Sequence, residues 1–156
     1  MAVGTSIRVA RPDDTAAIVA LVNEAYRVES FFVQGNRVEA PEIRGLTSAG
    51  ELLVAEQDGQ VAACVHVSVR GEGGYFGMLA VHPHVQGQGV GHRLIAAAET
   101  RVREAGGRRM DIKVVNLRTD LLPLYQRLGY LATGTEPYTH RSVLRPCHFI
   151  LMTKLL

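Results

Sequence analysis

The sequence predicts an α/β fold in which a mixed, mostly antiparallel central sheet of about seven strands carries about four helices on both faces. Two apolar runs flank the Asp-Gly dipeptide at 58–59, which is typical of an antiparallel hairpin. The second half of the chain alternates strand and helix patterns. The 156 residues fit one domain over 1–156, and 47% apolar with 21% charged residues exclude intrinsic disorder.

The first third of the chain predicts a strand, a helix and a loop. A short extended run covers 6–10, and the stretch 11–14 then supplies a break and an N-cap. Over 29–50, glycines and prolines interrupt the pattern, so we expect a loop and one short helix. The helix between these regions is predicted by apolar residues at i, i+3, i+4, i+7 and i+8, namely Ile18, Leu21, Val22, Ala25 and Tyr26.

The hairpin is predicted to pair 52–56 with 61–69. A third strand is expected at 75–81, and its interior Gly77 indicates a bulge or a close backbone approach. In the second arm of the hairpin one face is fully aliphatic and should pack against helices; it carries Val61, Ala63, Val65, Val67 and Val69.

The remaining elements follow in order. A helix over about 89–105 should end at the glycine pair 106–107. A strand is expected at 110–115, and Asp120 can cap a helix over 121–128. Two final strands are predicted at 130–133 and 147–153. The first of these helices presents one apolar side, formed by Leu94, Ile95, Ala98 and Val102.

Charge and cysteine content exclude several classes of protein. Seventeen Lys and Arg against fifteen Asp and Glu give a net charge of +2, which predicts neither a nucleic-acid partner nor a membrane-surface partner. No apolar run is long enough to span a membrane, and the first residues do not resemble a signal peptide, so we expect a cytoplasmic protein. Cys64 and Cys147 are expected to be reduced core residues.

A glycine-rich turn in 81–94 is suited to binding an anion. It leads from a strand end into an amphipathic helix, where glycines let a ligand approach the backbone and the first helical N–H groups are free to donate to phosphate oxygens. A Walker A loop and a dinucleotide fingerprint both require another residue where His92 stands. Neither nucleotide-binding motif is therefore present.

The same turn spells Gln-x-x-Gly-x-Gly with Gln86, Gly89 and Gly91, after a strand end at 79–83. This resembles the acetyl-coenzyme-A-binding signature of the GNAT superfamily of N-acetyltransferases, and the predicted order of elements resembles that fold. The alternative is a tight turn that merely uses glycines. The resemblance implies that the coenzyme pyrophosphate is held by the amides of Gly87, Gln88, Gly89, Val90 and Gly91, and that pantetheine pairs with the backbone of Met78, Leu79 and Val81.

A second block, 116–130, is similar to the other coenzyme-contacting segment of that family. Its Asn116 closes a strand, and its helix presents Tyr125. The resemblance implies that Asn116 contacts the coenzyme, although a capping or turn role is the alternative. It casts Tyr125 as the general acid towards the coenzyme sulfur. Full proton transfer from an ordinary tyrosine to a thiolate would be uphill by about 2 kcal/mol, so we expect hydrogen-bond donation instead.

The resemblance implies an N-acetyltransferase that moves the acetyl group of acetyl-coenzyme A directly to an amine of a small molecule or peptide. A homodimer is expected only by analogy with the family. One alternative is a non-catalytic sensor of acyl-coenzyme A, and another, a Rossmann-like oxidoreductase, is disfavoured by His92.

The general base is not identified by the sequence. His140 and Arg141 could bind an acceptor carboxylate or stay in solvent, and we expect solvent. Phe31 and Phe32 either anchor the core or line the acceptor pocket. The histidines lack an accompanying metal-binding motif, so no metal is expected. The candidates for the base are Glu24, Glu29, Glu72, His66 and His82.

Overall fold

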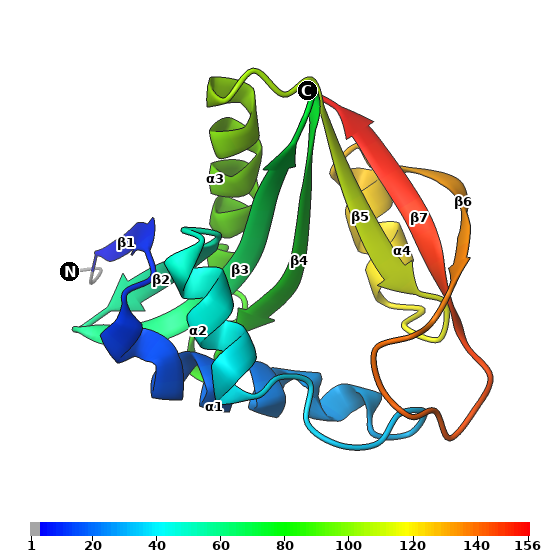
Figure 1. Cartoon of the computed structure of the whole chain (residues 1–156), viewed down its shortest axis with the longest axis horizontal. Coiled ribbons are helices and arrows are strands. Elements are labelled where there is room, and N and C mark those ends of the chain that lie inside the picture. The colour runs from blue at the N-terminus through cyan, green and yellow to red at the C-terminus, as the bar shows by residue number, and fades with distance from the viewer. Residues whose placement is uncertain (1–3) are drawn as a thin grey trace.

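The structure is a computed structural model and describes residues 4–156; the first residues of the segment compared with a signal peptide lie outside this range. Seven strands form one sheet in the order β1-β2-β3-β4-β5-β7-β6 (Figure 1). The strands are β1 (Thr5–Val9), β2 (Leu52–Gln57), β3 (Gln60–Arg70), β4 (Gly73–Val81), β5 (Arg109–Val115), β6 (Leu131–Pro137) and β7 (His148–Leu155). The helices are α1 (Thr15–Ala25), α2 (Ala40–Ser48), α3 (Val90–Glu104) and α4 (Leu121–Arg127), with 3₁₀ turns η1 (Pro12–Asp14), η2 (Tyr26–Glu29) and η3 (Pro83–Val85).

The predicted fold class is confirmed. All neighbouring strands are antiparallel except β4 and β5, which run parallel. These two strands pair only at their beginnings, where Gly73, Gly74 and Tyr75 face 109–111. Beyond that point β4 and β5 diverge (Figure 1). The second half of β4 therefore has a strand neighbour on one side only.

The hairpin between β2 and β3 is also confirmed. Asp58 has φ 54° and Gly59 has φ 74°, so both residues at the turn are left-handed. A tight two-residue hairpin turn needs this conformation, and Asp-Gly adopts it at low cost. A shift of pairing register next to Ala55 inserts Ala62 as an extra residue in β3, which moves Val61 to the opposite face from Val65.

A bulge distorts β4 close to Gly77. His66 of β3 faces Gly77, whereas Cys64 faces Ala80, so the single residue between them in β3 is opposite two residues in β4. Met78, one of those two, has φ 53° and adopts the left-handed backbone. A Cβ at Gly77 would lie 2.5 Å from the hydroxyl of Tyr75, so a larger residue here would require the Tyr75 side chain to move. The expectation of a bulge or close approach is confirmed.

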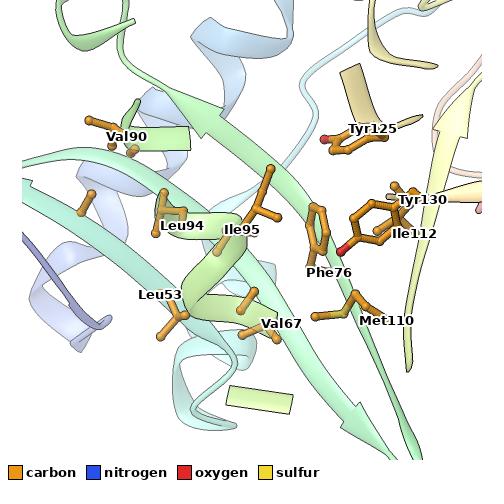
Figure 2. Close-up of a cluster of buried hydrophobic side chains, with 14 of the residues drawn as sticks. Leu53, Val67, Phe76, Val90, Leu94, Ile95, Met110, Ile112, Tyr125 and Tyr130 are labelled. Carbon is orange, nitrogen blue, oxygen red and sulfur yellow. The ribbon is translucent and has the colours of Figure 1, made fainter. Parts of the chain in front are cut away.

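Helices cover both faces of the sheet. On one face α3 and α4 pack against the strands, and Figure 2 shows Ile95 of α3 beside Phe76 of β4. On the other face α1 and α2 bury a second apolar cluster. The aliphatic face of β3 contacts α3 as expected through Ala63, Val65 and Val67, but Val69, next to the β3–β4 turn, stays 41% exposed.

Two expected helix caps do not form. Asp120 stands at the N-cap position of α4, but its carboxylate makes no capping hydrogen bond and instead accepts bonds from Arg118 at 3.1 and 3.2 Å. Asp14 stands before α1 and likewise does not cap it, because its carboxylate accepts from the Arg11 amide and from Arg8. In both places a guanidinium is the stronger partner for the carboxylate.

Candidate functional site

The glycine-rich turn forms an open cradle at the start of α3. Gly87 has φ 82° and Gly89 has φ 79°, and a Cβ at either position would meet no atom within 4 Å. The N–H of Arg93 donates to the Gly89 carbonyl at 3.1 Å, which is the first helical bond at this end. The amides of Val90, Gly91 and His92 precede it and have no acceptor within the helix. They are positioned to donate to an anion.

This turn borders a cavity of about 490 Å³, here called the loop cavity. Gln88 lies outside its lining, and its side-chain amide donates to the His84 carbonyl at 3.2 Å. Gln86 lines it and donates to the Val81 carbonyl at 3.1 Å, which ties the turn to the end of β4. The lining residues are Leu79, Val81, Val85, Gln86, Gly87, Gly89, Val90, Gly91, His92, Ile95 and Leu124.

A second cavity, here called the deep cavity, lies where β4 and β5 diverge and has a volume of about 70 Å³. Leu79 lines both this cavity and the loop cavity, so the two spaces adjoin at that side chain. The deep cavity is lined by Tyr26, Glu29, Arg37, Tyr75, Phe76, Gly77, Met78, Leu79, Lys113, Val115, Leu121, Tyr125, Tyr138, His140 and Phe149.

The exposed edge of β4 connects the two cavities. Beyond Tyr75 this strand has no pairing with β5, and the bulge at Met78 interrupts its pairing with β3. A strand edge of this kind presents backbone N–H and C=O groups that can pair with the amides of an extended ligand. Met78, Leu79 and Val81, predicted from the sequence to pair with pantetheine, all lie along this part of β4.

Tyr125 lies at the wall of the deep cavity. This residue belongs to α4, and its side chain is buried. The centroid of its ring lies 5.9 Å from the ring centroid of Phe76 and 6.0 Å from that of Tyr130 (Figure 2). Burial raises the pKa of Tyr125 to about 12. The hydroxyl therefore keeps its proton at neutral pH and can act as a hydrogen-bond donor.

Asn116 lies apart from both cavities. Its N–H donates to the His148 carbonyl and its Oδ1 accepts from the His148 N–H, each at 2.9 Å. These bonds extend the pairing of β5 with β7 by one residue. In this position the side chain holds the start of β7.

Glu29 is the one sequence-predicted base candidate that lines the deep cavity. Its buried carboxylate accepts from Arg118 at 3.0 Å and from Arg141 at 2.5 Å. The expectation that Arg141 stays in solvent is wrong, because its side chain is 8% exposed and held by this ion pair. With both oxygens engaged, Glu29 links η2 to the loops before α4 and β7 and is poorly available as a base.

The other four base candidates lie outside the lining of the deep cavity. Glu24 pairs with Arg27 on the surface, and Glu72 lies exposed in the β3–β4 turn. His66 lies 2.9 Å from the Glu51 carboxylate, and His82 accepts from the His84 amide at 3.2 Å.

The two phenylalanines before the irregular region do not line the deep cavity either. Phe32 is fully buried in a small cluster with Val33, Val115 and Phe149, so it anchors the core. Phe31 is 47% exposed.

Sequence reasoning missed several polar residues of the deep cavity. His140 is exposed, as expected, yet it lines this cavity, and desolvation there lowers its pKa, with further lowering from the nearby charges of Arg37, Lys113 and Arg141. A neutral imidazole at pH 7 can accept a proton. No motif marks these positions, because they come from separate segments. The missed polar residues are Tyr26, Arg37, Tyr75, Lys113, Tyr138 and His140.

Both cysteines are free; Cys64 is buried and Cys147 is partly buried. Within residues 4–156, no group of three or more His, Cys, Asp or Glu side chains is arranged to hold a metal ion. No helix in the described part of the chain is both long and apolar enough to cross a membrane.

Residues 16–130 match the Acetyltransferase (GNAT) family. The chain therefore belongs to this family, as the turn at 86–91 and the block 116–130 indicated.

Solved structures show the same fold. The chain superimposes on a ribosomal-protein-alanine N-acetyltransferase from Brucella melitensis with a TM-score of 0.78 and 22% identity, covering 97% of this chain and 99% of that one. It superimposes on yncA from Salmonella typhimurium, solved with its cofactor acetyl-CoA, with a TM-score of 0.79 and 22% identity, covering 98% of this chain and 94% of that one. An N-acetylglutamate synthase from Neisseria gonorrhoeae, complexed with coenzyme A and N-acetyl-glutamate, gives a TM-score of 0.75 and 20% identity, covering 100% of this chain and 36% of that one.

Proposed function

We propose that this protein transfers the acetyl group of acetyl-coenzyme A directly to an amine of a small molecule or peptide. The observation that carries the proposal is that the loop cavity and the deep cavity share Leu79, which lies on the part of β4 that does not pair with β5. A long ligand with an anionic end and an extended amide-bearing arm matches this sequence of features.

The residues present fit the coenzyme. An extra Cβ at Gly87 or Gly89 would meet no protein atom within 4 Å, so the backbone there is open to a phosphate group. The amides of Gly87, Gly89, Val90 and Gly91 would hold the pyrophosphate, with each charge-assisted bond contributing about 1.5–3 kcal/mol. The N–H of Gln88 instead donates to the Val85 carbonyl at 3.3 Å. The backbone of Met78, Leu79 and Val81 would pair with the pantetheine amides along the edge of β4. Asn116 would support this arrangement by fixing the end of β5.

When bound, the coenzyme supplies an activated acetyl thioester. Tyr125 would donate a hydrogen bond towards the sulfur from the wall of the deep cavity. With its pKa raised to about 12, full transfer of its proton to a thiolate of pKa about 8.5 would be uphill by about 5 kcal/mol. Tyr125 would therefore stabilise developing charge on sulfur rather than protonate it, and His140 would be placed to accept the proton of the amine.

Direct transfer is supported by the state of the cysteines. Burial raises the pKa of Cys64 to about 12, and burial also raises the pKa of Cys147. A covalent carrier requires a thiolate, and both shifts oppose its formation at neutral pH. Neither cysteine lines the deep cavity or the loop cavity.

Titration calorimetry with acetyl-coenzyme A, followed by measurement of thiol release, tests the proposal. The amine panel covers amino acids, polyamines, aminoglycosides and peptide N-termini, with mass spectrometry of the acetylated product. We expect binding and amine-dependent release above the rate of hydrolysis. Absence of heat at millimolar coenzyme would contradict the proposal, and binding with no release for any amine would favour the non-catalytic sensor.

A further inference from the structure

The deep cavity also adjoins another cavity, here called the outer cavity, whose lining does not include the glycine-rich turn. This outer cavity has a volume of about 410 Å³. It shares Arg37, Tyr75, Lys113 and His140 with the deep cavity, whereas the loop cavity joins the deep cavity at Leu79. The deep cavity therefore adjoins the outer cavity through a larger set of side chains than it shares with the loop cavity. The outer cavity is lined by Arg37, Glu42, His66, Arg70, Tyr75, Lys113 and His140.

Two guanidinium groups of the outer cavity lack a carboxylate partner. Within residues 4–156, Arg37 and Arg70 form no ion pair, although Glu42 lines the same cavity. Lys113, by contrast, pairs with Glu136 at 2.9 Å. Positive charge at this mouth is therefore only partly compensated.

Each unpaired guanidinium rests on a tyrosine that lines the deep cavity. Arg37 lies over the ring of Tyr26 at 5.4 Å from its centroid, and Arg70 lies over Tyr75 at 5.7 Å. Stacking on an aromatic ring restrains a guanidinium while leaving the N–H groups at its edge free to bind a carboxylate in a bidentate manner. The two side chains are held ready for an anion.

The same lining is unsuited to a second cationic group. Among the described residues, the deep and outer cavities are lined by two carboxylates, Glu29 and Glu42. Glu29 is already engaged by Arg118 and Arg141. A polyamine would therefore place its additional charges among arginine and lysine side chains, which is unfavourable.

We propose that the acceptor is an amine that also carries a carboxylate, with the carboxylate bound by Arg37 and Arg70 in the outer cavity and the amino group in the deep cavity. This inference rests on the proposed transferase function. It deepens that function by naming the chemical class of the acceptor, and it assigns Arg37 and Arg70 as specificity-determining residues.

Matched acceptors test the inference. Thiol release is measured at fixed acetyl-coenzyme A with L-alanine and L-glutamate, with their carboxamides, and with spermidine. A peptide with an acidic second residue forms a further arm, which separates a free amino acid from a peptide as the source of the carboxylate. We expect kcat/KM for the best carboxylate acceptor to exceed that of its amide by about tenfold or more.

Two variants and a matched control test whether Arg37 and Arg70 bind the carboxylate of the acceptor. Arg37→Gln and Arg70→Gln should each lower kcat/KM for the carboxylate acceptor by about 10- to 100-fold, and Arg70→Gln, at a residue outside the lining of the deep cavity, should leave that for the amide within about twofold. The coenzyme dissociation constant should not change. Arg44→Gln is the control, because Arg44 is exposed on α2 and lines none of the three cavities.

The outcomes separate the two proposals. Amides or spermidine reacting as fast as the acids, with no effect of Arg37→Gln or Arg70→Gln, would overturn carboxylate recognition and leave the transferase function intact. If the coenzyme binds but no amine releases thiol, the transferase proposal fails. Calorimetry of L-glutamate against the coenzyme-loaded protein then decides the inference: binding that Arg37→Gln abolishes supports it, and no binding overturns it.

Discussion

The guanidinium of Arg118 lies 3.0 Å from the carboxylate of Glu29, although 89 positions separate them in the chain. Arg141 contacts the other oxygen of the same carboxylate. This buried cluster joins η2, the loop before α4 and the loop before β7 at the wall of the deep cavity. The residues that shape this cavity are thus held together by charge as well as by apolar packing.

Glu29→Ala should lower the free energy of unfolding by about 3–5 kcal/mol, because it leaves the buried guanidinium of Arg141 without a carboxylate partner and leaves Arg118 with Asp120 alone. Urea denaturation followed by circular dichroism measures this change. Glu24→Ala is the control, since Glu24 pairs with Arg27 on the surface and its loss should cost no more than about 0.5 kcal/mol. Equal effects of the two substitutions would refute a structural role for the cluster.

Gly89→Ala should weaken acetyl-coenzyme A binding by about tenfold or more, because a methyl group there would project into the open cradle. Gly106→Ala at the other end of α3 is a matched control, with φ 90° and equally open space around the added Cβ. Both variants should lose about 1–2 kcal/mol of stability through left-handed strain. If Gly106→Ala reduces coenzyme affinity as much as Gly89→Ala, the turn is not the binding site.

Tyr125→Phe should lower the turnover number by about 10- to 100-fold with little change in coenzyme affinity, because only the hydroxyl donor is lost. Tyr130→Phe is the matched comparison, since Tyr130 also packs against Phe76. Its hydroxyl donates to the buried Glu99 carboxylate at 2.7 Å, so its loss should cost about 1–3 kcal/mol of stability and leave turnover unchanged. Unchanged turnover for Tyr125→Phe, measured where chemistry limits the rate, would remove Tyr125 from the mechanism.

Asp14 should contribute to the pH dependence of stability. Hydrogen bonds from Arg8 at 2.8 and 3.0 Å lower the pKa of its carboxyl in the folded protein. The stabilisation is therefore fully present above the unfolded pKa of about 3.9 and is lost as the pH falls through the lower folded value. Asp14→Asn should reduce the free energy of unfolding by about 1–2 kcal/mol at pH 7, and the difference from wild type should shrink as the pH falls below about 3.9.

Urea titrations across this pH range measure the effect. Asp13→Asn is the control, because Asp13 is the exposed neighbour of Asp14. A difference between Asp14→Asn and wild type that persists undiminished at pH 2 would show that the effect does not come from this ionisation.

Most elements of the fold could be predicted because their signals are local. The Asp-Gly turn, the apolar stripe of α3 and the glycine-rich stretch at its start each lie within one short segment. Element ends were less well predicted. β6 extends to Pro137 rather than ending at 133, because β7 continues to pair with it along the sheet edge.

The side-chain partners could not be predicted in the same way. Asp120 follows the sequence pattern of a helix cap, yet Arg118 takes its carboxylate. Arg141 follows the sequence pattern of a surface residue, yet its side chain is buried in an ion pair with Glu29. In each case the folding of loops brings a charged partner to the side chain, and the resulting ion pair replaces the role that the local sequence predicts. Amino-acid composition does not indicate these ion pairs.

The sequence by itself determined the order of strands and helices, the family and the turn suited to a phosphate, because periodicity and glycine spacing act over a few consecutive residues. Only the tertiary structure decided where chemistry can occur. The divergence of β4 from β5 after Tyr75 opens the deep cavity, and it gathers side chains from η2, both strands, α4 and the loop before β7. Distances between such side chains depend on how whole elements pack, and no single segment encodes them.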